Sequence, residues 1–166
     1  MDISVKQAAE ADIPVIEGIL LNTVNWLKKI KQPLWGTDEV RWDSLSKNYQ
    51  ADNFYIAYID DVPSGCMVLV DYDPFFWPDV KLGESLFIHK LAVVESARKS
   101  GAASTLLDFA KEQGRIHGVD SIRLDTHALR PRLRAFYERH GFVCVNEKVW
   151  NNNWYSAFYE YPISKD

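Results

Sequence analysis

The sequence has little of what builds a metal scaffold or a membrane anchor. It contains two cysteines, Cys66 and Cys144, and neither their number nor their spacing suggests a zinc site or a disulfide framework. Both stand in apolar, strand-like runs, so we interpret them as buried thiols. No apolar run approaches the roughly 20 residues that span a bilayer, and the opening MDISVKQAAEAD lacks the apolar core of a signal peptide. We therefore expect a cytoplasmic protein with no membrane partner and no metal.

Positive charge is not in excess either. The chain has 19 Lys and Arg against 23 Asp and Glu, a net charge of −4. Nucleic-acid binding draws its affinity from a basic surface, so we expect no nucleic-acid partner. Aromatic residues, in contrast, are abundant, with six Trp, eight Tyr and eight Phe in 166 residues. Most aromatic rings pack in cores, but with so many we expect some to line a pocket.

No internal repeat, low-complexity tract or linker interrupts the chain, so we predict a single domain over residues 1–166. Hydrophobic periodicity and turn signals predict strands at residues 3–7, 54–60, 61–73, 85–94, 121–125, 142–150 and 154–162. They predict helices from Asp12 to about Pro33, over 39–49, from about 102 to Gly118, and over 131–141. The order β-α-α-β-β-β-α-β-α-β-β indicates an α/β (α+β) fold with a mixed central sheet of about seven strands and about four helices.

The stretch ARKSGAAS, residues 97–104, places two cations and five very small residues directly before an amphipathic helix. Small residues let a ligand lie on the backbone, and the first N–H groups of a helix have no intrahelical partner. Together with the helix dipole and the mobile charges of Arg98 and Lys99, these groups would form a site for a phosphate or pyrophosphate.

Two other interpretations of this stretch stay open. The small residues would equally let the helix pack closely on the sheet, with both cations in solvent. A nucleotide-binding βαβ module would also place phosphates here. However, the sequence has neither the Gly-Lys-Ser/Thr ending of the phosphate loop nor the three-glycine dinucleotide fingerprint.

The surrounding sequence resembles the Gcn5-related N-acetyltransferase (GNAT) superfamily. LAVVESARKSGAASTLLDFAKEQGRIHG resembles its acetyl-CoA motif, a Leu-Ala-Val strand end followed by Arg/Gln-x-x-Gly-x-Gly/Ala. The matching residues here are Leu91–Val93, Arg98, Gly101 and Ala103. The element order also resembles that of the family over nearly the whole chain.

A second motif of the family follows at the right distance. RLDTHALRPRLRAFYERHGF resembles the family's strand and helix at Tyr137, Gly141 and Phe142. The sequence departs from the motif at Arg130, which stands where the family usually has an Asn that contacts the cofactor. The role of that Asn is therefore not carried over.

The resemblance implies the GNAT fold, with splayed central parallel strands and acetyl-CoA as co-substrate. The pyrophosphate would lie on amides of residues 99–104, the pantetheine beside Leu91 and Val93, and the oxyanion near amides of Ala92–Val93. The implied cofactor-binding residues are Leu91, Ala92, Val93, Arg98, Lys99, Ser100, Gly101, Ala102, Ala103, Ser104 and Tyr137.

The resemblance also implies an acyl-CoA-dependent N-acyltransferase in which an amine attacks the thioester directly. Tyr137 is at the family's position for the acid that protonates the leaving thiolate, and an unperturbed phenol pKa of about 10 allows this at neutral pH. A packed core ring with a satisfied hydroxyl is the alternative interpretation of Tyr137.

His89 is our candidate for the base that deprotonates the amine, directly or through water, because an imidazole pKa of about 6.5 suits the task. FIHKLAV also resembles a strand of serotonin N-acetyltransferases in which a histidine at this place serves in proton transfer. A packed or capping histidine is the alternative. Glu84, at the beginning of the same strand, is a second candidate base and His127 a third.

The acceptor pocket is predicted from three aromatic segments, WLKKIKQPLWGTDEVRW, DPFFWPD with its two aspartates, and VWNNNWY. Aromatic walls with a few carboxylates suit an amine with an apolar body. The predicted substrate-binding residues are Trp26, Trp35, Trp77 and Trp150, with Trp42, Trp154, Phe75 and Phe76 nearby in sequence. Rings that merely cover the core are the alternative.

The leading hypothesis for function is therefore N-acetylation of a small primary amine. A protein or peptide amine is a variant of it, and a non-catalytic acyl-CoA sensor with the same fold is the rival from another class. The presence of Tyr137 favours the enzyme. The sequence leaves open whether the protein forms a homodimer.

Overall fold

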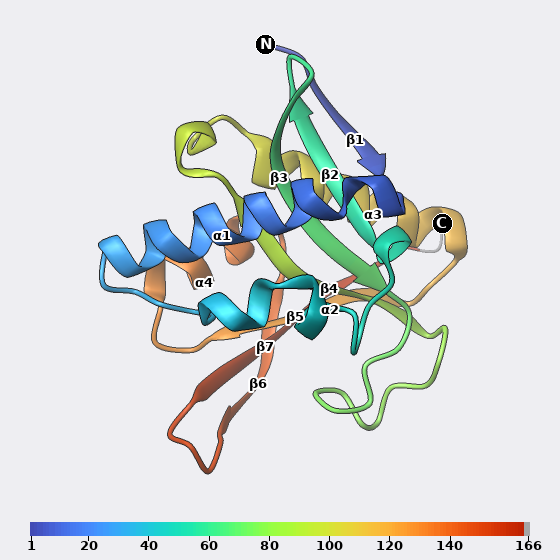
Figure 1. Cartoon of the computed structure of the whole chain (residues 1–166). Coiled ribbons are helices and arrows are strands. Elements are labelled where there is room, and N and C mark those ends of the chain that lie inside the picture. Colours follow the sequence, from blue (N-terminus) through green and yellow to red (C-terminus); the bar gives the residue numbers. More distant parts are fainter. Residues whose placement is uncertain (165–166) are drawn as a thin grey trace. The chain divides into compact units, whose positions relative to one another are not determined.

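The computed structural model describes residues 1–164, which contain seven strands and four α-helices. The strands are β1 (Ile3–Gln7), β2 (Phe54–Ile59), β3 (Val62–Val70), β4 (Ser85–Val93), β5 (Ser121–His127), β6 (Val143–Val149) and β7 (Tyr155–Pro162). The helices are α1 (Ile13–Lys29), α2 (Trp42–Leu45), α3 (Ala102–His117) and α4 (Pro131–Arg139) (Figure 1). Their order along the chain is the predicted one.

The strands form a sheet in the order β1-β2-β3-β4-β5-β7-β6. The pairs β1–β2, β2–β3, β5–β7 and β6–β7 are antiparallel, whereas β4 and β5 are parallel. A parallel pair needs a crossover connection, and α3 supplies it. The predicted mixed sheet with four helices is confirmed.

The parallel pairing between β4 and β5 is short. It joins Ser85–Phe87 to Ser121–Arg123, and no further register pair continues it within the described part of the chain. Beyond this point β5 stays paired with β7 as far as His127. The pairing of the parallel strands β4 and β5 therefore ends well before the carboxyl end of β5. This agrees with the predicted splaying of the two central strands.

The chain divides into two compact units, each built from separate segments. The first contains Met1–Leu69 and Lys90–Phe109, and the second contains Val70–His89 and the residues from Ala110 onward. Both β4 and α3 begin in one unit and end in the other. The single domain over 1–166, whose last two residues lie outside the described range, stays a prediction.

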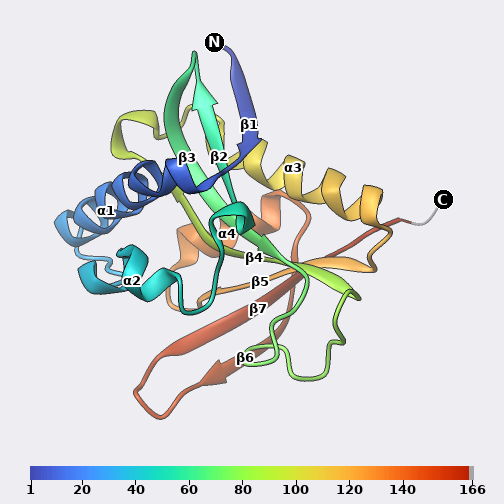
Figure 2. The same ribbon diagram turned by 45° about the vertical axis from the view of Figure 1, so that its right-hand side comes forward.

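In the first unit, α1 and the start of α3 cover opposite faces of β1–β3 (Figures 1 and 2). Leu20 and Val24 on the apolar stripe of α1 are buried, and so is Leu106 on α3. The Phe109 ring of α3 lies 5.1 Å from the Tyr55 ring of β2. Each buried aliphatic side chain contributes about 1.5–3 kcal/mol, so these contacts hold both helices against the sheet.

The segment after α1 corrects one prediction. In place of a helix over 39–49, the chain has a 3-10 helix at Thr37–Val40 and the four-residue α2. The break falls at Arg41, whose backbone is extended with φ −81° and ψ 149°. The Trp42 N–H then donates to the Glu17 carboxylate of α1 at 2.8 Å. At this position the chain makes a hydrogen bond to α1, and the helix expected over 39–49 does not form as one continuous element.

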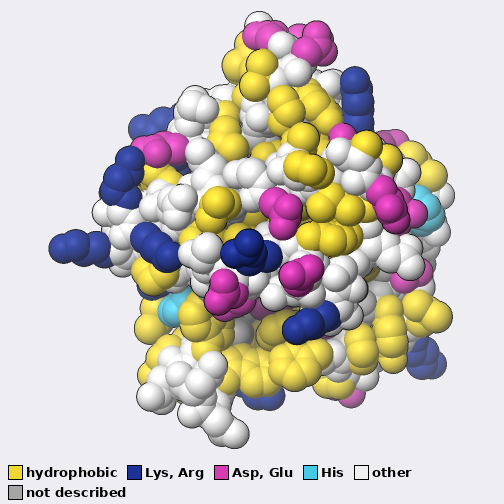
Figure 3. Space-filling view, in the orientation of Figure 1, with side chains coloured by type: hydrophobic (Ala, Val, Ile, Leu, Met, Phe, Trp, Pro, Cys, Tyr) yellow, Lys and Arg dark blue, Asp and Glu magenta, His cyan; other side chains and the backbone are white. Residues whose placement is uncertain are grey.

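The surface over α1 and α2 carries charges of both signs. Figure 3 shows acidic and basic side chains side by side there, without a broad area of one sign on this face. Within residues 1–164, no helix has both the length and the apolar composition needed to cross a bilayer.

Candidate active site

The connection between β4 and α3 forms a sharply turned loop in the first unit. A 3-10 helix at Glu95–Ala97 is followed by Lys99 with φ 62° and Gly101 with φ 95°. Left-handed residues in such a turn direct backbone N–H groups into a concave anion site. Helix α3 begins at Ala102, where its first N–H groups have no partner inside the helix. Two amides of this stretch already donate inside the loop, Ser100 N–H to the Ala97 carbonyl and Ala102 N–H to the Ser100 hydroxyl, both at 3.2 Å. Binding of the predicted pyrophosphate over residues 99–104 stays a prediction.

Arg98 differs from the mobile surface cation that the sequence predicts. Its guanidinium carbon lies 3.6 Å from the centroid of the Trp26 ring on α1, which is a close cation–π contact. Burial lowers the pKa of Arg98 from its ordinary value of 12.5, while nearby Glu95 acts in the opposite direction. Trp26, predicted for the acceptor pocket, thus contacts a cation of the loop between β4 and α3, and its role in acceptor binding stays a prediction.

Helix α1 also anchors the beginning of this loop. The Asn22 side-chain oxygen accepts the Glu95 N–H at 2.8 Å, and Lys29 Nζ lies 3.0 Å from the Glu95 carboxylate. The exposed ion pair adds little stability, so the hydrogen bond to the backbone is the contact that fixes the loop.

The end of β4, Leu91–Val93, is where the resemblance places the pantetheine arm. A Cβ at Gly65 of β3 would lie 2.8 Å from the Ala92 carbonyl oxygen, too close for any residue but glycine. Lys90 has a left-handed φ of 53° within the strand, at a cost of roughly 1–2 kcal/mol. Its carbonyl accepts a hydrogen bond from the buried Cys66 thiol at 3.8 Å. The backbone geometry here is therefore specific, although only the Leu-Ala-Val motif marked it in the sequence.

Cys66 itself fits the prediction of an inert buried thiol. It is fully buried, and burial raises its pKa to about 12. Because thiol reactivity depends on the thiolate, Cys66 is not a nucleophile at neutral pH. Cys144 is partly exposed, which differs from the predicted burial.

Tyr137, the predicted acid, lies on α4 in the second unit with its side chain 6% exposed. Its ring packs against the rings of Phe142 and Tyr159, with centroids 6.0 and 6.2 Å away. Burial, and to a lesser extent the charge of Asp125, raises the pKa of Tyr137 above its ordinary value of 10.0. The hydroxyl therefore holds its proton at neutral pH. The core-ring and proton-donor interpretations are compatible, and the acid role stays a prediction.

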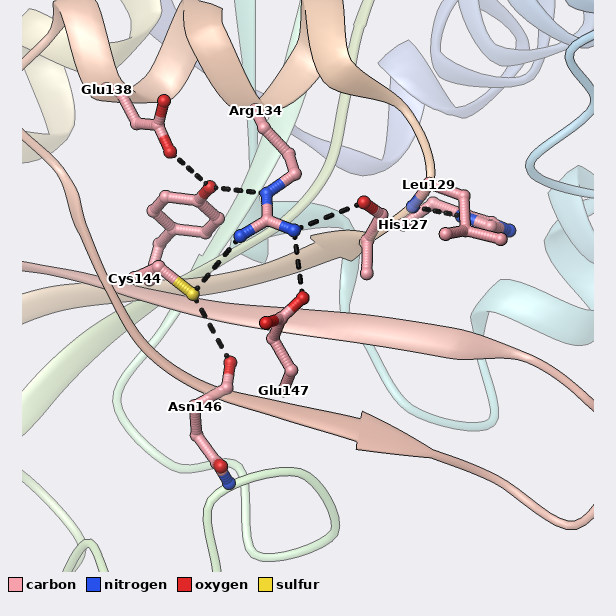
Figure 4. A network of polar contacts seen from close by, with 9 residues as sticks. His127, Leu129, Arg134, Glu138, Cys144, Asn146 and Glu147 are labelled. Carbon is pink, nitrogen blue, oxygen red and sulfur yellow. Dashed lines mark hydrogen bonds and ion pairs between the residues drawn. The ribbon is translucent and has the colours of Figure 1, made fainter.

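A polar network centred on Arg134 fixes the helix that carries Tyr137 (Figure 4). The Arg134 guanidinium donates to the Tyr159 hydroxyl at 2.8 Å, to the Glu147 carboxylate at 2.9 Å and to the Cys144 sulfur at 3.5 Å. The Tyr159 hydroxyl donates in turn to Glu138 at 2.8 Å. These contacts tie α4, the helix that carries Tyr137, to β6 and β7.

His89, the predicted base, lies beside the carboxylate of Asp73, which no motif in the sequence marks. Its Nε2 is 3.3 Å from Oδ2 of Asp73, and the two side chains are 15% and 8% exposed. The other Asp73 oxygen accepts the Phe76 N–H at 3.3 Å, and the Asp73 carbonyl accepts the Trp77 N–H at 2.9 Å. The sequence signal for Asp73 was only that it is one of two aspartates in DPFFWPD.

Asp125 of β5 completes this group. Asp73, His89 and Asp125 each offer one nitrogen or oxygen atom, and these atoms lie within 4.8 Å of one another. We call the three residues the His89 cluster. Imidazole and carboxylate groups also bind metals, so the expectation that the protein holds no metal stays a prediction. Asp125 lies close to His89, and its charge raises the pKa of Tyr137.

Glu84, the second candidate base, is engaged elsewhere. Its carboxylate accepts the Lys81 N–H at 2.8 Å, a local turn contact directly before β4. Along a strand, the five residues from Glu84 to His89 span about 16 Å. The structure therefore does not bring the two candidates together, and it gives Glu84 a structural contact.

His127, the third candidate base, has its lone pair occupied. Its Nδ1 accepts the Leu129 N–H at 3.1 Å, and its ring lies 4.4 Å from the Trp154 ring. Burial, and next the charge of Arg130, lowers the pKa of His127 below 6.5. In the neutral ring the proton must then be on Nε2, so this imidazole is placed to donate and not to accept.

The aromatic segments of the second unit extend from the core to the surface, because the half-buried Trp150 packs against the Trp77 cluster and also stacks on Phe75. Trp77 is buried in a cluster with Phe87 and Phe158, so the structure gives this predicted pocket residue no open face. Trp150 stacks on Phe75 with centroids 5.4 Å apart and an interplanar angle of 6°. Because Phe75 is 70% exposed, this pair brings the 71–84 loop and the β6–β7 turn together at the surface. Its role in acceptor binding stays a prediction.

The remaining tryptophans lie apart from that pair. In the first unit, Trp35 lies under Lys90, whose Nζ is 5.1 Å from the ring centroid, and Trp42 packs near Phe54 at 6.0 Å. Trp154 covers His127 in the second unit. The predicted pocket residues are thus distributed over both units, and the sequence could not distinguish which rings lie together.

Comparison with known proteins identifies the class. A model of the Acetyltransferase (GNAT) family matches residues 21–142. The chain is 24% identical over 141 residues to YesJ of Bacillus subtilis (strain 168), an uncharacterized N-acetyltransferase, a match that covers 81% of this chain and 78% of that protein. The chain therefore belongs to the acetyltransferase (GNAT) family, and the resemblance seen in the sequence is confirmed.

Solved structures show the same fold. A GNAT-family acetyltransferase from Listeria monocytogenes superposes with a TM-score of 0.75 at 20% identity, over 95% of this chain and 94% of that one. N-acetylglutamate synthase from Neisseria gonorrhoeae, solved with coenzyme A and N-acetyl-glutamate, gives a TM-score of 0.71 at 18% identity. That match covers 99% of this chain but 36% of the synthase. The GNAT fold predicted for the chain is confirmed.

Proposed function

We propose that this protein is an N-acetyltransferase that moves the acetyl group of acetyl-CoA to a primary amine on a small molecule. The observation that carries the proposal lies in the second unit. There, a buried and protonated phenol, Tyr137, accompanies an imidazole paired with a carboxylate, His89 with Asp73. A sensor that only binds acyl-CoA has no need of either group, whereas aminolysis of a thioester needs an acid and a base.

In the proposed reaction, His89 removes a proton from the ammonium form of the acceptor, directly or through water. The freed lone pair forms a C–N bond to the thioester carbonyl carbon, and amides near Ala92–Val93 stabilise the oxyanion. The C–S bond then breaks as Tyr137 gives its proton to the leaving thiolate, and the second proton, lost by the acyl nitrogen as the amide forms, returns to the Tyr137 phenolate. No acyl-enzyme forms, in agreement with the high pKa of the Cys66 thiol.

Acetyl-CoA is the proposed co-substrate, and the loop between β4 and α3 is its proposed pyrophosphate site. The left-handed backbone at Lys99 and Gly101 and the guanidinium of Arg98 beside it support this assignment. The synthase from Neisseria gonorrhoeae, which has the same fold, was solved with coenzyme A bound. The residues proposed to contact the cofactor remain the motif residues 91–93 and 98–104, together with Tyr137.

For the acceptor we propose a small amine with an apolar body. The exposed Phe75 ring, which stacks on the half-buried Trp150, supports this, because flat aromatic faces bind apolar groups and cations. A peptide amine is the alternative within the same chemistry, and the experiment below separates the two.

Two further expectations belong to this proposal. The two cysteines are free, which suits the reducing cytoplasm. Strand β6 ends the sheet order and exposes Val143, Val145 and Val149, so a second copy could pair with it to form a homodimer. Light scattering on the purified protein tests the dimer.

The deciding experiment is a screen of small amines and amine-bearing peptides that measures the release of free CoA from acetyl-CoA. We expect turnover with at least one small amine and none with a Tyr137→Phe, His89→Gln double variant. Turnover with peptides alone would move the acceptor class to proteins. Binding of acetyl-CoA, seen as a raised melting temperature, without turnover of any amine would identify a sensor.

A further inference from the structure

We propose that Asp73 is a positioning residue that fixes the tautomer of His89, so that Nε2 carries the proton and Nδ1 carries the basic lone pair. The inference rests on the proposed function only for its kinetic consequence. The arrangement of the imidazole is a property of the protein alone and is measurable without any substrate.

The state of the Asp73 carboxylate supports this proposal. Its Oδ2 atom is buried, and within residues 1–164 it accepts no hydrogen bond of good geometry. The His89 Nε2 at 3.3 Å is an ion-pair distance, so this contact is real but not well aligned for a hydrogen bond. Catalytic hydrogen bonds are often long or poorly aligned before the ligand binds and tighten afterwards. A buried carboxylate oxygen needs a donor, and the His89 Nε2 atom at 3.3 Å is placed to supply it.

Hydrogen bonds from backbone N–H groups hold Asp73 rigidly in place. Its Oδ1 accepts the Phe76 N–H and its carbonyl accepts the Trp77 N–H, so backbone contacts fix both the residue and its side chain. Trp77 is itself packed in the core with Phe87, two residues before His89 on β4. The Oδ2 atom is thus aimed by the fold, which is the requirement for a group that orients another side chain.

The hydrogen-bonding capacity of the two side chains decides which nitrogen of His89 carries the proton. An ionised carboxylate can only accept hydrogen bonds, and a neutral imidazole has one donor nitrogen and one acceptor nitrogen. A carboxylate at Nε2 therefore places the lone pair on Nδ1. Asp125, whose carboxylate also lies within 4.8 Å of both partners, competes for the imidazole from β5 and must be tested as an alternative.

The experiment records the imidazole nitrogens by NMR in uniformly ¹⁵N-labelled protein, at a pH where the spectrum shows the neutral ring. His89→Gln assigns the resonances. We expect the Nε2–H form in the wild type and a shift toward Nδ1–H in Asp73→Asn, whose amide can donate to Nε2. Asp79→Asn, a change of the same kind at an exposed aspartate of the same loop, should leave the wild-type form.

Kinetics then measure the consequence. With an amine found by the screen, we expect Asp73→Asn to lower kcat by at least about 10-fold with the KM for acetyl-CoA unchanged, as for a weakened general base. Asp73→Glu keeps the carboxylate and should recover part of the loss.

Several results would overturn the proposal. They are an Nδ1–H ring in the wild type, an unchanged ring in Asp73→Asn, or a switch caused by Asp125→Asn in its place. If one equivalent of Zn²⁺ displaced the proton on Nε2, the His89 cluster would be a metal site instead. A correct tautomer without turnover of any amine would leave this inference standing and refute the proposed function.

Discussion

The loop between β4 and α3 in the first unit and the His89 cluster in the second are built in different ways. In the loop, consecutive residues present their backbone, and the side chains at Gly101 and Ala102 matter because they are small. In the His89 cluster, three side chains come from the 71–84 loop, β4 and β5, at positions 73, 89 and 125. The loop is therefore a local feature and the cluster a tertiary one.

This difference explains why the two were not equally visible in the sequence. A backbone site needs a short run of small residues before a helix, which a motif records directly. A side-chain cluster needs residues whose separation along the chain carries no fixed meaning. The predictions below test whether the two regions are as separate in function as they are in construction.

The largest effect is expected at Gly101, the left-handed residue of the loop. Gly101→Glu introduces strain at φ 95° and a negative charge at the proposed pyrophosphate site. Losing one to two charge-assisted contacts should raise the Kd for acetyl-CoA about 100-fold or more, measured by calorimetry.

Gly118 supplies the matched control for that prediction. It also has a left-handed φ, 68°, but at the other end of α3, and a Cβ there would meet nothing within 4 Å. Gly118→Glu should therefore cost comparable strain and leave acetyl-CoA affinity near that of the wild type. Equal affinity of the two variants would show that the loop is not the anion site.

The next largest effect is expected at Tyr137. Tyr137→Phe removes one hydroxyl and keeps the packed ring, so kcat should fall by about 10²–10³ with little change in the KM for acetyl-CoA. An acyl donor with a more acidic thiol should recover part of the rate. A folded variant that binds acetyl-CoA and works at the wild-type rate would remove Tyr137 from the mechanism.

A smaller pair of effects should separate the two aromatic regions. Trp150→Leu disrupts the stack on Phe75 and should raise the KM for the acceptor about 10-fold without affecting acetyl-CoA. Trp26→Leu removes the ring under Arg98 and should raise the KM for acetyl-CoA by a few-fold. If both variants changed the same KM, the division between cofactor and acceptor rings would be wrong.

The smallest effect concerns stability at acid pH. The pKa of His127 is lowered by burial and by Arg130, so below pH 6.5 the unfolded chain binds a proton that the folded protein resists. The stability contributed by the neutral ring is therefore present above pH 6.5 and is lost as the pH falls through the lower, folded-state pKa.

Urea unfolding at pH 7 and at pH 5 measures this loss. His127→Gln should show a smaller decrease in unfolding free energy between the two pH values than the wild type does. His117→Gln, at an exposed histidine on α3, is the control and should behave as the wild type. An unchanged decrease in His127→Gln would assign the acid sensitivity to other groups.

Most of the fold was predictable because its signals are local. Alternating apolar residues, Pro at the start of helices and Gly at their ends gave the order of all seven strands and located α1, α3 and α4. The helix predicted over 39–49 failed because Trp42 bonds to Glu17 on α1, a contact between distant residues that no local pattern encodes.

The candidate site was predictable only in part for the same reason. Tyr137 and the loop residues lie inside motifs, whereas Gly65 beside Ala92 and Asp73 beside His89 are partners across strands or loops. Arg98 and Trp26 are 72 positions apart, so their contact could not be read from either segment. The tryptophans show the limit most clearly, because similar sequence surroundings led to a core position for Trp77 and a surface stack for Trp150.

The sequence by itself determined the family, the order of the elements and the backbone loop, since each depends on residues adjacent in the chain. The tertiary structure alone decided what surrounds each of the two candidate imidazoles. His89 and His127 have the same side chain, but the fold places a carboxylate at Nε2 of the first and a backbone N–H at Nδ1 of the second. A carboxylate accepts a hydrogen bond from the imidazole N–H, so the lone pair is on the other ring nitrogen. A backbone N–H donor instead uses the imidazole lone pair itself.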